Sequence, residues 1–380
     1  MIYFDNSATT QINEEVLQTF IEVTRSVNGN PSSMHALGDQ AASLMKQSRM
    51  QIASLLAVTP QEIYFTSGGT EGDNWAIKGT AIEKKVYGNH IITTTVEHPA
   101  VSESIGQLEQ FGFEVTYLPV DRNGVISITD LKNAIRKDTI LVSVMAVNNE
   151  VGSVQPIEEI GEVLKDYPSI HFQVDAVQAI GKIPVHLGPN SRIDIAVFSS
   201  HKFHGPKGTG FIYLKKGRKI ASLMNGGGQE NRIRSGTENV AGIAATGKAL
   251  RLVMTDATNK QKKQREIRDY LINELNNYKK IVLFSTQAGA PHILCFALKG
   301  IRGEVLLHAF ENESIYISTT SACSSRKKAS SSTLSAMHVP DSLAVDAVRI
   351  SLSDTNTMEE AKQFMSVFKK LYKKFQSINA

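Results

Sequence analysis

Short apolar runs alternate with longer amphipathic stretches through the first two thirds of the chain. Apolar residues recur at helical spacing over residues 14–27 and 38–56, which predicts two amphipathic helices. The short runs predict buried strands at 63–65, 90–95, 114–118, 140–147, 171–174, 193–198 and 210–214. Because both faces of these strands are apolar, we expect a mostly parallel sheet between layers of helices. Sites in such sheets form at the carboxyl ends of the strands.

The pattern changes after about residue 249. It predicts a polar, lysine-rich helix, two strand-like pieces and a final helix, over residues 259–278, 293–298, 314–318 and 359–375. The final helix has an apolar face opposite a lysine-rich one, which is typical of a packed helix with one solvated side. We therefore predict two domains. The large one spans residues 13–255, and the smaller one combines residues 1–12 with 256–380.

The composition is that of an ordinary soluble globular protein. Hydrophobic residues make up 41% of the 380 positions, and 41 basic against 37 acidic residues give a net charge of +4. This excess is too small to predict direct binding of nucleic acid. No apolar run reaches the roughly 18 residues of a membrane span, and the first residues lack the pattern of a secretion signal. Two cysteines, Cys295 and Cys323, are too few for a disulfide framework or a four-cysteine zinc site, so we expect a cytoplasmic protein without a metal.

One lysine stands just after a predicted strand. The segment DIAVFSSHKFHGPKGTG carries Ser199, His201 and Lys202 from the strand 193–198 into a turn rich in glycine and proline. A lysine in partly desolvated surroundings has a lowered pKa and can form a Schiff base with an aldehyde. A lysine in a turn is more often an ordinary surface residue, so the assignment of Lys202 depends on its neighbours.

An aspartate ends another predicted strand. In IHFQVDAVQAI, Asp175 follows a hydrophobic run, where a carboxylate is expected either to cap a helix or to meet a cation. The pyridine nitrogen of pyridoxal phosphate is such a cation, and an aspartate beside it keeps the ring an electron sink. Gln178 follows about one helical turn later, where it is placed to reach the phenolic oxygen of the ring.

A glycine-rich turn predicts a phosphate site. In IYFTSGGTEGDNWAI, a strand is followed by Gly68, Gly69 and Thr70 and then by a helix. Backbone N–H groups at such a helix start, together with the helix dipole, favour a phosphate. The turn also fits ordinary helix capping. It is neither a Walker loop nor a dinucleotide fingerprint, which favours a single phosphate monoester.

Together these segments resemble one enzyme family. The motifs occur in this order over essentially the whole chain: SGGTEGDN, TTTVEHPAV, VNNEVGSVQPI, VDAVQAIGK, SSHKFHGPKGTG, GGGQENRIRSGT, SACSS and VRISLS. In this order they resemble the cysteine desulfurases, which belong to the class V aminotransferases. The resemblance implies the α/β fold of the fold type I pyridoxal phosphate enzymes, with a mostly parallel seven-stranded sheet in a large domain beside a smaller α+β domain.

The resemblance assigns a role to each motif. It implies a Schiff base between Lys202 and pyridoxal phosphate, and it implies that His98 stacks on the ring and takes part in acid–base catalysis. Asp175 and Gln178 are then expected at the pyridine nitrogen and the phenolic oxygen, and Asn149 beside cofactor and substrate. The residues expected at the phosphate are Gly69, Thr70, Ser199, His201 and, from the neighbouring subunit of a homodimer, Thr237.

Arg349 resembles the arginine that binds the carboxylate of the L-cysteine substrate, a task that suits its planar fork of donors. Taken singly, these residues also fit ordinary roles. His98 is also typical of a loop histidine, Asn149 of a turn, and Arg349 of a surface ion pair.

The resemblance separates the two cysteines. Cys323 of SACSS matches the catalytic cysteine of the family, and the basic RKK that follows favours its reactive thiolate. The serine- and lysine-rich stretch 318–335 predicts a mobile loop that carries sulfur from the cofactor to another protein. Cys295, inside HILCFAL, is expected to be a buried strand residue. The implied reaction converts L-cysteine into L-alanine and a persulfide on Cys323.

Three alternatives stay open. An aminotransferase, or a lyase acting on another amino acid such as selenocysteine, keeps the cofactor without needing a cysteine nucleophile. A noncatalytic scaffold keeps only the fold.

Among desulfurases, SACSSRKKASSSTLSAMHVP departs from the SACTSxSLEPS pattern of the housekeeping iron–sulfur enzymes. It resembles more closely the branch that serves a tRNA 4-thiouridine synthetase in Gram-positive bacteria, so we expect that synthetase as sulfur acceptor rather than an iron–sulfur scaffold.

Overall fold

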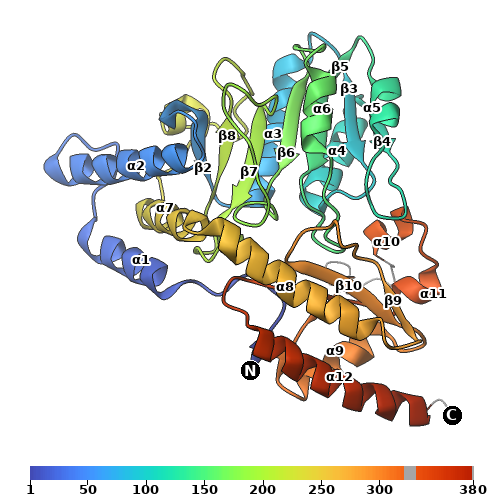
Figure 1. The fold of residues 1–380 in the computed structure, drawn as a ribbon. Helices are drawn as coiled ribbons and strands as arrows, with labels where there is room; N and C mark the ends of the chain where they lie inside the picture. The colour runs from blue at the N-terminus through green and yellow to red at the C-terminus, as the bar shows by residue number, and fades with distance from the viewer. Residues whose placement is uncertain (321–330, 379–380) are drawn as a thin grey trace.

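The computed structural model describes residues 1–320 and 331–378, so Cys323 lies outside the described part of the chain. Two separate sheets form the centres of an upper and a lower unit (Figure 1). The upper unit contains a seven-stranded sheet in the order β2-β8-β7-β6-β5-β3-β4. Only β8 runs against the others. The predicted mostly parallel sheet is confirmed.

The predicted strands of this sheet are all present, and their observed ends differ from the predicted ones by at most two residues. The strands are β2 (Ile63–Thr66), β3 (His90–Thr94), β4 (Glu114–Leu118), β5 (Thr139–Met145), β6 (His171–Asp175), β7 (Ile195–Ser199) and β8 (Gly210–Leu214). Five of them, β3, β5, β6, β7 and β8, are buried at every position, which explains their continuous apolar runs.

Helices cover both faces of the large sheet. Successive strand residues point to opposite faces, so Ile91 lies in a core cluster with residues of α3 and α4, while Ile92 belongs to a separate cluster that includes residues of α6 and α7. The helices of this unit are α1 (Glu14–Ser26), α2 (Ala36–Leu55), α3 (Gly69–Lys84), α4 (Pro99–Gln110), α5 (Ile128–Ala134), α6 (Ile157–Leu164) and α7 (Val240–Met254). The first two, predicted from their apolar spacing, pack mainly against α7.

The lower unit has its own sheet and its own core. Its antiparallel sheet has the order β12-β13-β10-β9, and a two-stranded parallel sheet pairs β1 with β11. The strands are β1 (Ile2–Tyr3), β9 (Ile281–Leu283), β10 (Ile293–Leu298), β11 (Ile315–Tyr316), β12 (Ser318–Thr319) and β13 (Ala347–Ser351). The helices are α8 (Ala257–Leu275), α9 (Gly303–Glu311), α10 (Ser332–Ala336), α11 (Asp341–Ala344) and α12 (Met358–Ile378). Because β1 joins this unit, the first residues of the chain lie beside its last helix (Figure 1).

Two details differ from the sequence prediction. The single strand expected at 314–318 is divided into β11 and β12, which pair with different strands. The stretch 318–335 was expected to be a loop, but its described ends are regular, since it begins in β12 and ends in α10. Cys295 lies fully buried in β10, as predicted, and burial raises the pKa of its thiol. The domain boundary near residue 255 stays a prediction.

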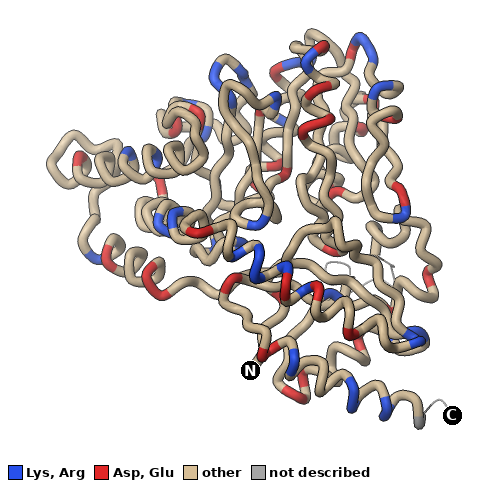
Figure 2. The backbone as a smooth tube through the Cα atoms, viewed as in Figure 1, with Lys and Arg blue, Asp and Glu red and all other residues tan. Residues whose placement is uncertain are grey.

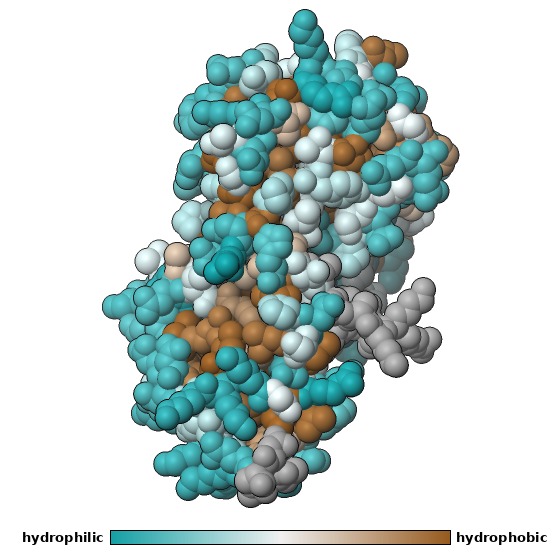
Figure 3. All heavy atoms as spheres, turned by 90° about the vertical axis from the view of Figure 1, so that its right-hand side faces the viewer, coloured by the Kyte–Doolittle hydropathy of each residue, from teal (hydrophilic) through white to brown (hydrophobic). Residues whose placement is uncertain are grey.

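Charges of both signs are spread over the described chain, with no large region of one sign (Figure 2). On the face seen in Figure 3, hydrophobic residues gather mainly over the lower part of the molecule. No helix in the described ranges is both long and apolar enough to span a bilayer.

We predict that Phe368→Ala lowers the free energy of unfolding of the cofactor-free protein by about 3–5 kcal/mol. The ring is fully buried in α12 and meets Tyr278 edge-on, with ring centroids 4.9 Å apart. Urea unfolding followed by circular dichroism measures the change. Phe111→Ala is the matched control, because that ring is 68% exposed and its removal costs less than about 0.5 kcal/mol. Equal losses in the two variants would contradict the assignment of Phe368 to the core.

Candidate active site

The carboxyl ends of five parallel strands bring most of the predicted site residues to one edge of the large sheet. These strands are β2, β3, β5, β6 and β7, which run in one direction. The residues that follow them or end them are Gly69, Thr70, His98, Asn149, Asp175, Ser199, His201 and Lys202. Parallel strands place their carboxyl ends together, so the clustering follows directly from the fold.

The turn between β2 and α3, with Gly68, Gly69 and Thr70, is called the anion cup here because its backbone suits an anion. Gly68 has a φ of +149°, which is strained for residues with a side chain. A Cβ on Gly69 would lie 2.9 Å from Val177 Cγ2, so this position also excludes a larger residue. The 16-residue helix α3 begins at Gly69, and its first N–H groups have no partner within the helix. These groups and the helix dipole suit a phosphate.

Lys202 ends a short 3-10 turn, Ser200–Lys202, that follows β7. Its Nζ donates hydrogen bonds to the backbone carbonyls of Ser7 and Ala8, the latter at 2.9 Å. Burial lowers the pKa of the ammonium to about 8, and the charges of Arg349 and Lys182 act in the same direction. At neutral pH about a tenth of this amine is neutral, far more than for an ordinary lysine, and the neutral amine is the form that makes a Schiff base.

His98 caps the start of α4, with Nδ1 accepting a hydrogen bond from the N–H of Ala100 at 3.1 Å. This bond requires a lone pair on Nδ1, so the ring proton lies on Nε2. Burial lowers the pKa of the ring, and the charge of Lys202 adds to this effect. His98 is therefore a neutral ring with one defined N–H, which suits both stacking and proton transfer.

His201 is neutral for a similar reason. Burial, with the charges of Lys202 and Lys207, lowers the pKa of its ring to about 4. Its Nδ1 shares a hydrogen bond of 3.1 Å with the hydroxyl of Thr9, so only Nε2 remains for another partner. A phosphate contact by His201 would use that nitrogen.

Arg349 is held by two partners in the same chain. Its Nη2 donates to Asp5 Oδ1 at 2.7 Å, and its Nη1 donates to the backbone carbonyl of Asn149 at 2.9 Å. The Nε atom is buried and has no partner among the described residues. Asp5 was missed by the sequence analysis. The signal for it was a carboxylate directly after the apolar start MIYF, which needs a cation to offset its desolvation.

The turn that contains Asn149 also forms hydrogen bonds to residues 331–333, which follow the undescribed segment 321–330. Asn148 Nδ2 donates to Thr333 Oγ1 at 3.2 Å, and Ser331 Oγ donates to Glu150 Oε2. Burial raises the pKa of Glu150, although the hydrogen bond from Ser331 opposes the shift. The end of the predicted cysteine loop is thereby attached to the edge where the site residues gather.

Comparison with known proteins decides the family. The family described as aminotransferase class-V matches residues 2–364. The chain belongs to this family. A "NifS/IcsS protein homolog" from Lactobacillus delbrueckii subsp. bulgaricus is 53% identical over 100% of the chain and 99% of that protein. A "Cysteine desulfurase IscS" from Dictyoglomus turgidum is 41% identical over 100% of the chain and 96% of that protein. A solved "NIFS-LIKE PROTEIN" is 38% identical and superimposes with a TM-score of 0.92, covering 98% of this chain and 99% of the other.

Class V aminotransferases use pyridoxal phosphate, and the edge of the sheet fits this cofactor. Gln178 Nε2 donates to the carbonyl of Ser7 at 3.0 Å, whereas Gln178 Oε1 and Ser7 Oγ are buried without a partner among the described residues. Buried polar atoms rarely stay unpaired in native proteins, so the unpaired atoms point to a polar ligand. Asp175 would supply the acceptor that a protonated pyridine nitrogen requires, and one of its oxygens accepts the N–H of Val177 at 2.9 Å.

Two buried acids beneath this edge were not predicted. Burial raises the pKa of Glu97 to about 8, even though its Oε1 accepts hydrogen bonds from Met145 N and Thr94 Oγ1. Burial, and then the charges of Asp175 and Glu97, raise the pKa of Asp73 well above its ordinary value. Burial raises the pKa of Asp175 as well, but the hydrogen bond from the Val177 N–H and the charges of His98 and Lys202 oppose that shift. A protonated pyridine nitrogen beside Asp175 would favour its carboxylate form further. No sequence pattern reports these shifts, because they depend on depth of burial.

Thr237 stands apart from the other predicted residues. It is exposed, in a loop whose Arg234 donates to both carboxylate oxygens of Glu71 at 2.7 and 2.9 Å. Glu71 belongs to the first turn of α3, so the loop is attached beside the anion cup. Within the part of the chain that the structure describes, no contact joins Thr237 to that cup.

The same loop contains an unusual left-handed turn. Glu230, Asn231 and Arg232 have φ angles of +45°, +56° and +68°. Residues with side chains normally adopt this conformation singly. Glu230 anchors the turn, because its carboxylate accepts hydrogen bonds from Arg49 Nη1 at 2.9 Å and from the N–H of Phe65 at 3.0 Å.

We predict that the cofactor-free protein takes up pyridoxal phosphate faster as the pH rises, with a midpoint near the pKa of about 8 of Lys202. Only the neutral amine attacks an aldehyde, so the rate rises until Lys202 has lost its proton. Growth of the visible absorbance band between pH 6 and pH 10 measures the rate. A midpoint near the ordinary lysine value of about 10.4 would contradict the low pKa. Lys202→Ala is the control and should form no band.

Proposed function

We propose that this chain is a pyridoxal-phosphate-dependent cysteine desulfurase that converts L-cysteine into L-alanine and leaves a persulfide on Cys323. The observation that carries the proposal is the gathering of Lys202, Asp175 and His98 at one sheet edge, with Arg349 of the other sheet attached to the same edge. The family and the names of the relatives support the same activity.

The residues at this edge of the sheet have different roles in binding the cofactor and the substrate, according to their position and charge. Bound pyridoxal phosphate supplies an aldehyde for an amine and an electron sink. Lys202 would hold the cofactor through its amine, and Asp175 would accept a hydrogen bond from the protonated pyridine nitrogen. Arg349 binds the substrate carboxylate, which competes with Asp5 for the guanidinium. The neutral rings and amides around the cup, from His98, His201 and Gln178, orient the cofactor without adding charge. The anion cup formed by Gly69, Thr70 and Ser199 holds the phosphate.

Proton transfer and sulfur transfer use different residues. Lys202 removes the substrate α-proton, and His98 holds a proton at Nε2 for acid catalysis. The Cys323 thiolate then attacks the substrate sulfur. An S–S bond forms, the Cβ–S bond breaks, and the electron pair of that bond remains on the carbon side, where protonation completes alanine. Atoms and electrons balance without an external oxidant.

We further propose that the active unit is a homodimer in which Thr237 reaches the phosphate of the neighbouring subunit. The exposed position of Thr237 supports this arrangement, and so does the attachment of its loop beside the anion cup through Arg234 and Glu71. Asn149 is proposed to contact cofactor and substrate through its side chain, since its backbone carbonyl is already used by Arg349.

We predict that Cys323→Ser keeps the visible absorbance of the cofactor but lowers alanine release from L-cysteine by about 100-fold or more, because the hydroxyl is a poor acceptor of sulfur. Alanine is quantified after incubation with L-cysteine and a thiol. In the parent protein, mass spectrometry should show one added sulfur on the Cys323 peptide. Cys295→Ala is the control and should keep its activity, since that thiol is buried and protonated.

Equal alanine release by the parent and Cys323→Ser would exclude the proposed sulfur transfer and favour a transaminase or another lyase. A purified parent protein without a visible absorbance band would favour a noncatalytic scaffold.

We propose a tRNA 4-thiouridine synthetase as the sulfur acceptor. The support is the sequence of the cysteine segment, which departs from the iron–sulfur pattern SACTSxSLEPS. The relatives named cysteine desulfurase IscS favour the alternative of a general sulfur donor that also serves iron–sulfur assembly. With the synthetase as acceptor, the connection to RNA runs through a protein, in keeping with a net charge of only +4.

Sulfur transfer from the ³⁵S-labelled persulfide distinguishes the two acceptors. We predict faster labelling of purified 4-thiouridine synthetase than of an iron–sulfur scaffold protein at equal concentrations. Faster labelling of the scaffold would overturn the choice of acceptor while leaving the desulfurase activity intact. Cys323→Ser protein serves as the background for both reactions.

A further inference from the structure

We propose that Lys182 is a positioning residue for Lys202: it holds the Lys202 turn by a hydrogen bond to its backbone, together with one ordered water in an adjoining small cavity. The inference rests on the proposed role of Lys202 as the Schiff-base lysine. Lys182 ends the motif VDAVQAIGK, whose other polar residues face the cofactor site, and no step of the reaction uses it.

Lys182 is almost completely buried, with 5% of its surface exposed. Its Nζ donates to the backbone carbonyl of Lys202 at 3.2 Å, which is its single hydrogen bond to the described residues. The two lysines thus make different contacts at the same turn. The side chain of Lys202 extends to the carbonyls of Ser7 and Ala8, while Lys182 contacts the backbone of the turn.

An ammonium group has three N–H donors, so two donors of Lys182 remain to be satisfied. A cavity of about 10 Å³ adjoins the group, and its walls include Lys182, Lys202, Gln264 and Asp354. This is about the room that one water molecule needs. Gln264 is 3% exposed, and its Oε1 has no partner in the described chain. A water that accepts from Lys182 and donates to Gln264 satisfies the Gln264 oxygen and one of the two remaining donors of Lys182.

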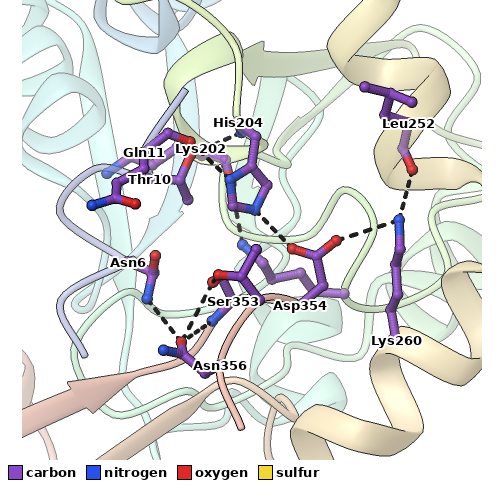
Figure 4. A network of polar contacts seen from close by, with 12 residues as sticks. Asn6, Thr10, Gln11, Lys202, His204, Leu252, Lys260, Ser353, Asp354 and Asn356 are labelled. Carbon is purple, nitrogen blue, oxygen red and sulfur yellow. Dashed lines mark hydrogen bonds and ion pairs between the residues drawn. The ribbon is translucent and has the colours of Figure 1, made fainter. Parts of the chain in front are cut away.

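A network of polar contacts between the two units includes three residues that line this cavity, His204, Lys260 and Asp354 (Figure 4). His204 Nε2 pairs with Asp354 Oδ1 at 2.9 Å, and Lys260 Nζ pairs with Asp354 Oδ2 at 3.3 Å. Lys263 Nζ donates to the backbone carbonyl of Asp354 at 2.9 Å. Although burial opposes ionisation, the hydrogen bond and charge of His204 hold the pKa of Asp354 far below its usual range. The cavity therefore has a fixed negative charge at its wall.

The charges around both lysines decide their effect on each other. Burial lowers the pKa of Lys182 to about 8, and Asp354 is the charge that opposes the shift. Lys202 has Arg349 and Lys182 as cationic neighbours and Asp175 and Asp5 as anionic ones. While Lys182 is protonated, its charge beside the turn disfavours a second charge at Lys202, so Lys182 keeps more of Lys202 in the neutral form that captures the cofactor.

The test uses cofactor-free protein, so its result does not depend on turnover. Competitive labelling with acetic anhydride across pH 6–10, followed by peptide mass spectrometry, measures the pKa of Lys202. We expect Lys182→Met to raise that pKa by about one unit, which slows labelling at pH 7.5 by about tenfold. Lys182→Arg keeps the charge and should keep the parent value.

Lys260→Met is the matched control. The substitution removes a cation from the same network, where Lys260 also donates to the Leu252 carbonyl at 2.7 Å. Among the described residues, Lys260 makes no hydrogen bond to Lys202. It should leave the pKa of Lys202 unchanged. An unchanged pKa in Lys182→Met, or an equal shift in Lys260→Met, would overturn the proposal. Should Lys182→Met not fold, Lys182→Gln is judged by the same titration.

A separate measurement keeps the proposed function distinct. If the parent holoenzyme releases no alanine from L-cysteine, the desulfurase assignment fails, whereas the titration still reports whether Lys182 acts on Lys202.

Discussion

The hydrogen bonds of residues 5–13 are the constraint on which the rest of the site depends. Thr10 donates from its backbone N–H and from its hydroxyl to the carbonyl of His201, at 2.9 Å in both cases, and so fixes the turn of Lys202, the proposed Schiff-base lysine. At the other end of the segment, Asp5 holds Arg349. The segment crosses from the lower unit to the upper one. A single stretch of backbone therefore positions both Arg349 and the turn of Lys202, which are proposed to act on the same substrate.

Much of the fold follows from local patterns. The continuous apolar runs identify the strands because both faces of the large sheet are covered, and the polar residues after Phe198 and Val174 stand out against that background. The positions of β11 and β12 were not predictable in the same way. Strands of two residues carry too few positions for an alternation to appear, and their pairing is set by partners far away in the chain.

The parts of the site that escaped prediction depend on long-range contacts or on burial. The pairing of Asp5 with Arg349 joins residues separated by 344 positions, and a single sequence holds no record of such a pairing. Glu97 reads as an ordinary acidic residue beside a histidine, and only its burial changes its protonation. Sequence therefore located the chemistry at the strand ends, whereas the ionisation states that tune it came from three-dimensional structure.

The left-handed turn at Glu230, Asn231 and Arg232 has a consequence for recognition. Holding three such residues in a row costs conformational energy, which the buried contacts of Glu230 offset during folding. Asn231 and Arg232 are nevertheless exposed. A molecule that binds this loop therefore meets a surface that is already rigid, and it loses little additional backbone entropy on association.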